Sequence, residues 1–273
     1  MCPGAPDGQH RGMRLLSLEE RPFHRIRFLN AAKRGGTETG HLPFLRGQVD
    51  ALPDGLDALL LTGDLQGVVQ DWTGSRLLGL EVAAACVSLS ERGSLPDPRR
   101  TGVLLAGDLY AAPGGDVRGA SGNVTPVWAA FAEAFAWVVG VQGNHDTFDP
   151  HPDTLGRAHL LDVDGVTLSS LNVAGVGGVI GDPARPARRQ EADYLAGVAL
   201  ALEHQPDVLL LHQAPALDAT QRGDEALSRV LRASPPPLTV CGHVHWDQPL
   251  GNLPGGASVL NVDKRVIVLT TCQ

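Results

Sequence analysis

The chain has 273 residues, 43% of them hydrophobic and 19% charged, which is enough for one large domain with a full core or for two small ones. Its formal net charge of −8 gives no overall attraction to nucleic acid or to an anionic membrane surface, although it leaves room for a local basic groove. No apolar run approaches the length of a membrane span, and the first residues lack the apolar core of a signal peptide, so we expect a cytoplasmic protein without a membrane segment. The four cysteines show no Cys-x-x-Cys spacing, and we expect buried or terminal thiols at Cys2, Cys86, Cys241 and Cys272.

The first 55 residues carry the weakest pattern. Residues 1–20 begin with many Gly and Pro residues, and we expect them to form a mobile N-terminal extension. Residues 24–29 alternate polar and apolar side chains, which predicts a strand. Residues 33–40 are polar and Gly-rich, as in a loop, whereas residues 42–52 fit a short helix or an irregular segment equally well. Residues 1–55 can therefore extend a sheet, cover a site or mediate dimerisation, and the oligomeric state is left open.

A strand–helix pattern begins at residue 56. Residues 56–62 are an apolar run typical of a buried strand, and Gly63-Asp64 follows it. Residues 75–92 show helical periodicity, and Gly93 and Pro96 end that helix.

The pattern then repeats. Residues 103–106 predict a second strand followed by Gly107-Asp108, and a Gly-rich loop covers residues 111–123. Thr125-Pro126 is typical of an N-cap followed by the first helical turn, and the helix continues to about Phe135.

A third strand over residues 137–142 leads into Gly143-Asn144-His145-Asp146. Strands that alternate with helices in this way run parallel, so their carboxyl ends share one edge of the sheet, where ligands bind in α/β proteins.

The second half is richer in strands. Asp164-Gly165 lies between the apolar runs 160–163 and 166–168 and predicts a β-hairpin. No linker is long enough to divide the chain, so we predict a single domain over residues 1–273. The remaining expected elements are strands over 171–179, 207–211, 238–241, 257–262 and 266–270, a loop over 181–189, and helices over 190–204 and 224–232.

Polar side chains follow five of the predicted strands and form a candidate metal site. Carboxylate, amide and imidazole ligands together suit Mn, Fe or Zn, and seven ligands suit two ions about 3.5–4 Å apart that share a carboxylate. Such a pair can bind a phosphate and activate a water. The candidate ligands are Asp64, Gln66, Asp108, Asn144, His212, His243 and His245.

Each motif also has a purely structural explanation. Gly63-Asp64 and Gly107-Asp108 are common in βα turns, and Gly-Asn-His-Asp is an acceptable turn sequence. His212 can be a hydrogen-bonded histidine at a strand end. By contrast, His243-Val244-His245 places two imidazoles on one face of an extended segment, which favours a metal. Five such motifs at successive strand ends favour the metal site.

The motifs Gly107-Asp108, Gly143-Asn144-His145-Asp146, His212 and Gly242-His243-Val244-His245 resemble those of the calcineurin-like metallophosphoesterases, in that order. The resemblance covers the chain from about residue 56 onwards. It implies an α/β fold, a four-layer α/β/β/α sandwich of two mixed sheets flanked by helices, with a dinuclear metal centre.

The resemblance also implies a role for each matching residue. Asp108 would bridge two divalent ions, with Asn144, His212 and His243 on one ion and Asp64 and His245 on the other. His145 would stabilise the transition state or protonate the leaving group, and Asp146 would orient His145. The family's first motif is usually Asp-x-His, whereas this chain has Asp64-Leu65-Gln66, so the first ion would bind more loosely or favour Mn²⁺.

The expected substrate is a small phosphodiester or phosphomonoester of nucleotide type. Arg185, Arg188 and Arg189 can contact its phosphate because guanidinium binds phosphate in a bidentate manner, although a solvated basic loop explains them equally well. Tyr110 can line the pocket. Two alternatives stay open: a nuclease, which the acidic net charge does not favour, and a scaffold that has lost catalysis and binds a protein partner.

Overall fold

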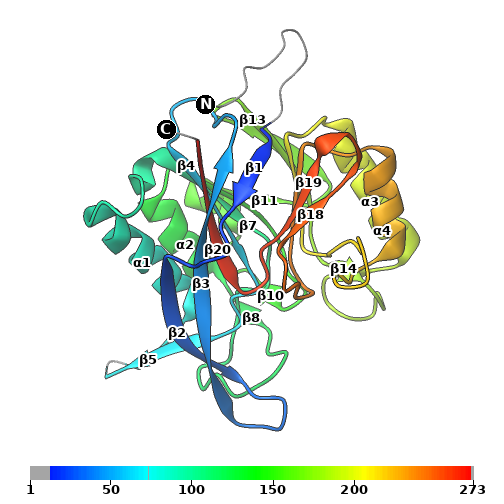
Figure 1. Ribbon diagram of the computed structural model, residues 1–273. Helices are drawn as coiled ribbons and strands as arrows, with labels where there is room; N and C mark the ends of the chain where they lie inside the picture. Colours follow the sequence, from blue (N-terminus) through cyan, green and yellow to red (C-terminus); the bar gives the residue numbers. More distant parts are fainter. Residues whose placement is uncertain (1–12, 73, 272–273) are drawn as a thin grey trace.

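Two mixed sheets form the framework of the computed structural model, which describes residues 13–72 and 74–271 (Figure 1). The larger sheet has ten strands in the order β11-β9-β7-β4-β20-β3-β2-β5-β6, with β1 paired to β3. The smaller sheet has six strands in the order β12-β13-β16-β17-β19-β18. Helices flank these sheets, so the predicted α/β fold class is confirmed.

The centre of the larger sheet consists of parallel strands. β4 (Ala58–Gly63), β7 (Thr101–Leu105), β9 (Trp137–Val141) and β11 (Ala158–Leu161) lie side by side in parallel. The first three strands are buried along their whole length, which explains their continuous apolar sequences. Their carboxyl ends meet at one edge, as the strand–helix alternation predicts.

The remaining strands of the larger sheet lie beyond β4. β20 (Arg265–Thr271) runs antiparallel to β4 and parallel to β3 (Thr37–Val49). β2 (His24–Ala31) and β1 (Leu15–Leu18) pair antiparallel with β3. A hairpin of β5 (Val68–Asp71) and β6 (Gly74–Leu77) completes this side of the sheet.

The smaller sheet repeats the parallel arrangement. Its four inner strands are parallel, and the edge strands β12 (Asp164–Leu168) and β18 (Leu250–Asn252) are antiparallel to their neighbours. The inner strands are β13 (Leu171–Val176), β16 (Val208–Leu211), β17 (Leu238–Cys241) and β19 (Ser258–Asn261). Two two-stranded ribbons lie outside the large sheets: β8 (Gly122–Asn123) with β10 (Asp146–Thr147), and β14 (Val179–Ile180) with β15 (Arg188–Arg189).

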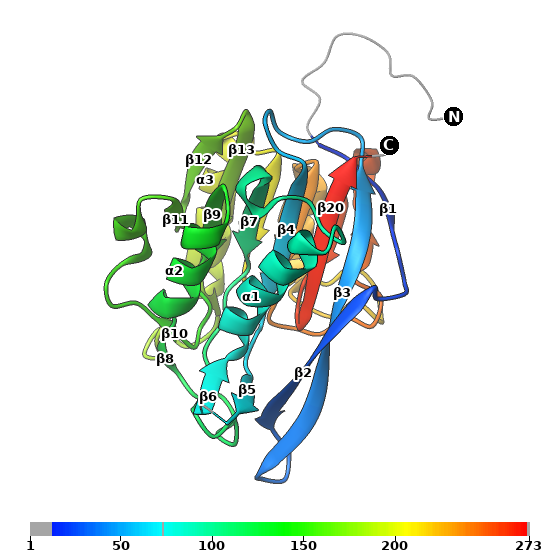
Figure 2. The ribbon, with the colours of Figure 1, turned by 90° about the vertical axis from the view of Figure 1, so that its left-hand side faces the viewer.

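Three apolar clusters hold the layers together. Helices α1 (Leu78–Glu91) and α2 (Thr125–Ala134) pack on the outer face of the larger sheet, as Figure 2 shows. Helices α3 (Glu191–Glu203) and α4 (Glu225–Ala233) cover the smaller sheet. The third cluster lies between the sheets and joins Leu104 of β7 to Leu210 of β16. Three short 3₁₀ helices lie in connections: η1 (Pro98–Arg100), η2 (Pro152–Leu155) and η3 (Pro254–Gly256).

The N-terminal region is more regular than the sequence predicts. Residues 1–12 lie outside the described residues, but β1 falls within the expected extension and pairs with β3. The expected loop over residues 33–40 is wrong in its second half, because β3 begins at Thr37. This strand continues to Val49, so the short helix or irregular segment expected over residues 42–52 is wrong as far as Val49. Thr37, Glu38 and Thr39 are exposed on the outer part of the β2–β3 hairpin, so the first part of this strand lacks the buried alternation by which strands are recognised.

The predicted hairpin around Asp164-Gly165 is wrong. β11 pairs with β9 in the larger sheet, whereas β12 pairs with β13 in the smaller one, so the chain crosses between sheets at this point. The Asp164 carboxylate accepts a hydrogen bond from the Asp162 amide at 2.7 Å and stabilises the crossover. The hairpin turn lies instead at Ser169 and Ser170, whose φ angles of 49° and 64° are those of a tight turn between antiparallel strands.

Two helix starts also differ from the prediction. α1 begins at Leu78, because Ser75 to Leu77 pair with β5. Thr125 is not the N-cap of α2: the cap residue is Val124, without a side-chain cap, and Asn123 Oδ1 accepts a hydrogen bond from the Thr125 amide at 2.9 Å.

Cys86 and Cys241 are buried free thiols, as expected, whereas Cys2 and Cys272 lie outside the described residues. Within residues 13–72 and 74–271, no helix combines the length and apolar character needed to cross a membrane.

Candidate metal centre

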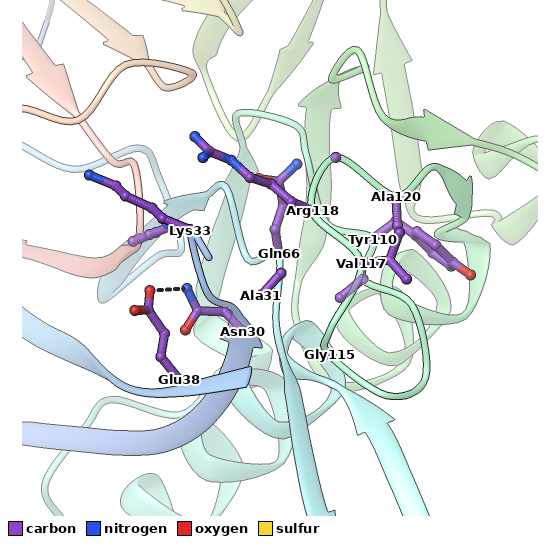
Figure 3. A pocket seen from close by; sticks show the side chains of 13 residues that line it. Asn30, Ala31, Lys33, Glu38, Gln66, Tyr110, Gly115, Val117, Arg118 and Ala120 are labelled. Carbon is purple, nitrogen blue, oxygen red and sulfur yellow. Dashed lines mark hydrogen bonds between the residues drawn. The ribbon is translucent and has the colours of Figure 1, made fainter. Parts of the chain in front are cut away.

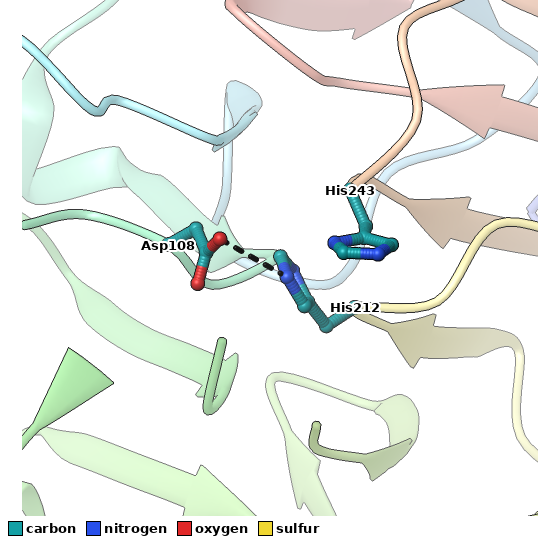
Figure 4. Close-up of side chains that lie close together, drawn as sticks. All are labelled: Asp108, His212 and His243. Atoms are coloured by element: carbon teal, nitrogen blue, oxygen red, sulfur yellow. Dashed lines mark ion pairs between the residues drawn. The ribbon is translucent and has the colours of Figure 1, made fainter. Parts of the chain in front are cut away.

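The carboxyl ends of five parallel strands bring the candidate ligands to one place. Asp64, Asp108 and Asn144 follow β4, β7 and β9 of the larger sheet, and His212 and His243 follow β16 and β17 of the smaller one. Asp64, Asp108, Asn144 and His212 are buried. Figure 4 shows that Asp108, His212 and His243 converge although they come from different sheets.

The backbone is strained at three of these positions. Asp64, Asp108 and His243 have φ angles of 53°, 56° and 67°, in the left-handed region that side chains other than glycine rarely adopt. Such strain persists only where the surroundings hold it, and it gathers at functional sites.

Neighbouring glycines allow the strand ends to approach closely. A Cβ atom on Gly143 would lie 2.1 Å from both the amide nitrogen and Oδ1 of Asp108, and one on Gly242 would lie 2.2 Å from Oδ2 of Asp64. Real Cβ contacts do not reach such distances, so Gly143 cannot carry a side chain unless the backbone of Asp108 moves, and a side chain at Gly242 would displace the Asp64 carboxylate.

A group of three ligand atoms is already formed. One ligand atom each of Asp108, His212 and His243 lies within 4.8 Å of the other two. His212 Nδ1 lies 2.7 Å from the carbonyl oxygen of Ala106, which can only accept, so Nδ1 donates a proton there. The other ring nitrogen, His212 Nε2, lies 3.5 Å from Asp108 Oδ2 and 3.3 Å from Asn144 Oδ1.

The electrostatics of this group favour a cation. Burial lowers the pKa of His212, but the carboxylates of Asp108 and Asp64 outweigh burial and raise it to about 10. Burial and the nearby Asp263 raise the pKa of Asp64 well above its usual value. In His243, burial and the charge on His212 lower the pKa to about 4, which leaves its imidazole neutral and able to bind a metal. A carboxylate, an amide oxygen and two imidazoles fit a divalent first-row ion.

The other expected ligands are arranged less favourably. Gln66 Nε2 donates to Asp108 Oδ2 at 3.0 Å, and Asp64 Oδ2 accepts from the His243 amide at 2.9 Å. His245 is half exposed, and its Nδ1 lies 2.9 Å from Oδ2 of Asp263. Among the described residues, Asp64 and His245 join no group of three potential ligands as compact as that of Asp108.

The sequence analysis missed Asp263 and Arg265. Asp263 is buried and follows the parallel strand β19, so the strand-end rule that found the other residues applies to it as well. Arg265 Nη2 lies 3.4 Å from each ring nitrogen of His245 and donates to the carbonyl of Trp246 at 2.7 Å. No simple sequence signal identifies Arg265, which stands within an apolar strand.

Contrary to the expectation that Asp146 orients His145, the Asp146 carboxylate does not contact the His145 ring. Its carboxylate accepts hydrogen bonds from three backbone amides: Asp108 at 2.7 Å, Leu109 at 2.8 Å and Gly143 at 3.1 Å. It therefore joins the loops after β7 and β9, and through them places Asp108. The partner of His145 is Ser121, whose Oγ lies 3.1 Å from Nδ1. Sequence reasoning missed Ser121 because it lies in a Gly-rich loop without a recognisable motif.

The three arginines of the basic loop have different surroundings. Arg189 forms an ion pair with Asp162, with Nη2 2.6 Å from Oδ1. Arg188 lies close enough to the centre for its charge to contribute to the lowered pKa of His243, after burial and His212. Arg185 is exposed. Tyr110 lines a pocket to which Gln66 also contributes.

The sequence model of the calcineurin-like phosphoesterases matches residues 58–247 of this chain. The chain belongs to the calcineurin-like phosphoesterase family. The match spans all the strand-end ligands described above except Asp263, which follows it. No curated protein matches the chain.

Three of the solved structures that match the chain are from Thermus thermophilus, Mycobacterium tuberculosis and Aquifex aeolicus. The chain has 17% sequence identity and a TM-score of 0.54 to TT1561 of Thermus thermophilus, over 76% of this chain and 91% of that one. The phosphopantetheinyl hydrolase PptH of Mycobacterium tuberculosis has 15% identity and a TM-score of 0.41, over 76% and 89%. The protein AQ665 of Aquifex aeolicus, of unknown function, has 11% identity and a TM-score of 0.34, over 77% and 95%. The similarity to TT1561 extends to the fold alone.

Proposed function

We propose that this chain is a metal-dependent phosphoesterase that hydrolyses phosphodiesters or phosphomonoesters of nucleotide type. The observation that supports this most directly is the compact group of Asp108, His212 and His243, with Asn144 Oδ1 beside it. Its ligand types suit a divalent ion, and the family gives the reaction class. A bound divalent ion supplies Lewis-acid chemistry: it polarises a phosphoryl oxygen and lowers the pKa of a water.

We propose two ions, with Mn²⁺ preferred and Fe or Zn as alternatives. Asp108, Asn144, His212 and His243 would hold the tighter one. Asp64, Gln66 and His245 would contribute to the weaker one, and Asp108 would contribute to both. Binding there would have one cost, because the Gln66 amide would have to turn its oxygen towards the ion, whereas His245 could offer Nε2 while Nδ1 keeps its contact with Asp263.

The chain's own residues then position and protonate the substrate. When His145 is protonated on both nitrogens, the Ser121 hydroxyl accepts a hydrogen bond from Nδ1, and Nε2 can give its proton to the leaving oxygen, which leaves a neutral imidazole. Asp108 Oδ1 accepts from the His145 amide at 2.9 Å, which fixes the backbone of the proton donor relative to the ligand. Arg188 adds positive charge near His243, where a phosphate would lie.

Metal content and turnover measured on one preparation test this function. The full chain is stripped of metal, refilled with Mn²⁺ and assayed for manganese and for hydrolysis of bis-nitrophenyl phosphate. We expect turnover that follows the manganese content. A refilled protein that hydrolyses neither phosphodiesters nor phosphomonoesters would contradict the proposal.

A protein-binding scaffold is the second candidate. Two observations favour it: Gln66 stands where the family usually has a histidine, and Trp72 is 95% exposed beside the β5–β6 turn, as a partner-binding residue would be. The same measurement separates the candidates, since a scaffold would bind one ion or none and show no turnover.

A further inference from the structure

A basic pocket adjoins the metal centre. It has a volume of about 190 Å³, and four segments far apart in sequence line it: the β2–β3 hairpin, the loop after β4, the loop after β7, and the connection before β20. The hairpin, the loop after β7 and the last connection each contribute one basic residue, namely Lys33, Arg118 and Lys264. Figure 3 shows Lys33 on the hairpin wall and Arg118 on the opposite loop.

The charge of this pocket differs from that of the whole chain. The chain carries a net charge of −8, yet the pocket lining holds three basic side chains and one acidic side chain, Glu38. Asn30 Nδ2 donates to Glu38 Oε1 at 3.2 Å, so this carboxylate already has a polar partner. Among the described residues, no carboxylate forms an ion pair with Lys33, Arg118 or Lys264. Three cations gathered in a concave site attract an anion.

Two contacts connect the basic pocket to the metal centre. Gln66 lines the pocket, and its Nε2 donates to Asp108 Oδ2 at 3.0 Å. The Gln66 side chain therefore lies between the pocket and the metal centre and contacts both. Gly119 also lines the pocket, and a Cβ atom there would lie 3.4 Å from Cε1 of His145. A substrate whose reacting phosphate lies at Asp108 therefore reaches the pocket with an adjacent part of the same molecule.

The loop that carries Arg118 is held in place by packing. A Cβ atom on Gly115 would lie 2.9 Å from Val68 and 3.2 Å from the carbonyl of Leu29, so the loop rests on β2 and β5. A Cβ atom on Gly122 would lie 2.4 Å from the Tyr110 ring, which closes the other end of the loop. The pocket thus has a fixed wall opposite the hairpin.

We propose that the basic pocket binds a second phosphate-type group of the substrate, so that this enzyme acts on molecules with two such groups. This inference rests on the proposed phosphoesterase function, and it specifies the substrate class. The second anion is either joined directly to the reacting phosphate, as in a diphosphate, or separated from it, as in a nucleoside bisphosphate. Both sources present the same chemistry to Lys33, Arg118 and Lys264.

A matched pair of substrates tests the proposal. The Mn²⁺-loaded full chain is assayed with thymidine 5′-(nitrophenyl phosphate) and with the same compound bearing a 3′-phosphate, which releases the same leaving group. Inhibition by inorganic pyrophosphate, relative to inorganic phosphate, examines directly joined anions. We expect one of two results, each of the size that a charge-assisted contact gives. Either the 3′-phosphate raises kcat/KM about tenfold, or pyrophosphate inhibits about tenfold more tightly than phosphate.

Substitutions locate the effect. Arg118→Gln and Lys33→Gln should each reduce the preference for the doubly charged molecule about fivefold. Arg34→Gln is the matched control, since Arg34 lies beside Lys33 on the same hairpin but does not line the pocket. It should leave the preference unchanged.

A binding measurement distinguishes failure of this inference from failure of the proposed function. Binding of thymidine 3′,5′-bisphosphate and of pyrophosphate to the full chain in chelator is measured by calorimetry, with the monophosphate and phosphate as references. The inference is supported, even without turnover, if the bisphosphate or pyrophosphate binds more tightly than its reference ligand. Arg118→Gln, but not Arg34→Gln, should weaken that binding. Turnover without any preference for a second anion, or equal effects of the Arg118 and Arg34 variants, would overturn the inference and leave the phosphoesterase function standing.

Discussion

Replacing Gly143 with Ala tests whether close packing of the strand ends places the ligand Asp108. The added Cβ would lie 2.1 Å from the amide nitrogen and Oδ1 of Asp108 and 2.8 Å from its Cα atom. Ordinary contact begins at 3.4 Å, so the two loops must separate by about 1 Å. A displacement of about 1 Å at a catalytic group costs about 100-fold in rate, and overpacking of this kind costs about 1–3 kcal/mol of folding free energy.

The assay compares manganese content, hydrolysis of bis-nitrophenyl phosphate and thermal unfolding of Gly143→Ala with those of the wild type. Gly197→Ala is the control, because Gly197 lies in α3 and its added Cβ would meet only side-chain atoms: Val163 at 3.1 Å, and Arg189 and Val176 at the ordinary contact distances of 3.6 and 3.7 Å. We expect the Gly143 variant to fold, to bind less manganese and to lose about two orders of magnitude in kcat/KM, with little change in the control. Wild-type manganese content and turnover in Gly143→Ala would refute the argument that this glycine positions Asp108.

Four further predictions follow from the centre. His145→Ala should retain manganese and lose about 10²–10⁴-fold in turnover, measured with a substrate whose leaving group needs protonation; unchanged turnover would remove His145 from the mechanism. Gln66→His should strengthen binding of the weaker ion about tenfold in a manganese titration, because imidazole replaces an amide that now donates to Asp108; an unchanged titration would show that Gln66 lies outside the site. A proton competes with the metal for His212 below its pKa of about 10, so apparent manganese affinity should rise up to about tenfold per pH unit between pH 6 and 8; equal affinity at both pH values would contradict this competition. Arg189→Ala breaks a partly exposed ion pair and should cost less than about 1 kcal/mol in thermal unfolding without affecting turnover, whereas a large loss of turnover would make Arg189 a substrate ligand.

The sequence predicts the strand ends well because burial and function leave strong local signals there. β4, β7 and β9 are buried along their length, and polar residues follow closely after all three strands, a recurrence that an ordinary βα turn at a single strand does not explain. The parallel pairing of these strands then follows from the helices between them. This reasoning identifies Asp108 and His212 without any three-dimensional information.

Other features depend on partners that the local sequence does not reveal. Whether Asp164-Gly165 forms a turn is decided by which sheet each flanking strand joins, and β11 and β12 join different ones. The preference of Asp146 for three backbone amides over the His145 ring likewise depends on how two loops pack. The pairing of His245 with Asp263 links segments 18 residues apart and has no periodic signal.

The position of β20 between β3 and β4 has a consequence for biosynthesis. β20 is translated after every other described strand, yet it provides the pairing through which β3, and with it β1, joins the parallel core. A nascent chain that has made β1 to β19 still has an unpaired edge on β4, and such edges promote aggregation. Asp263, beside the metal centre, and Lys264, in the basic pocket, directly precede β20 in the sequence. These two residues are therefore synthesised at nearly the same time as the strand that joins β3 to β4.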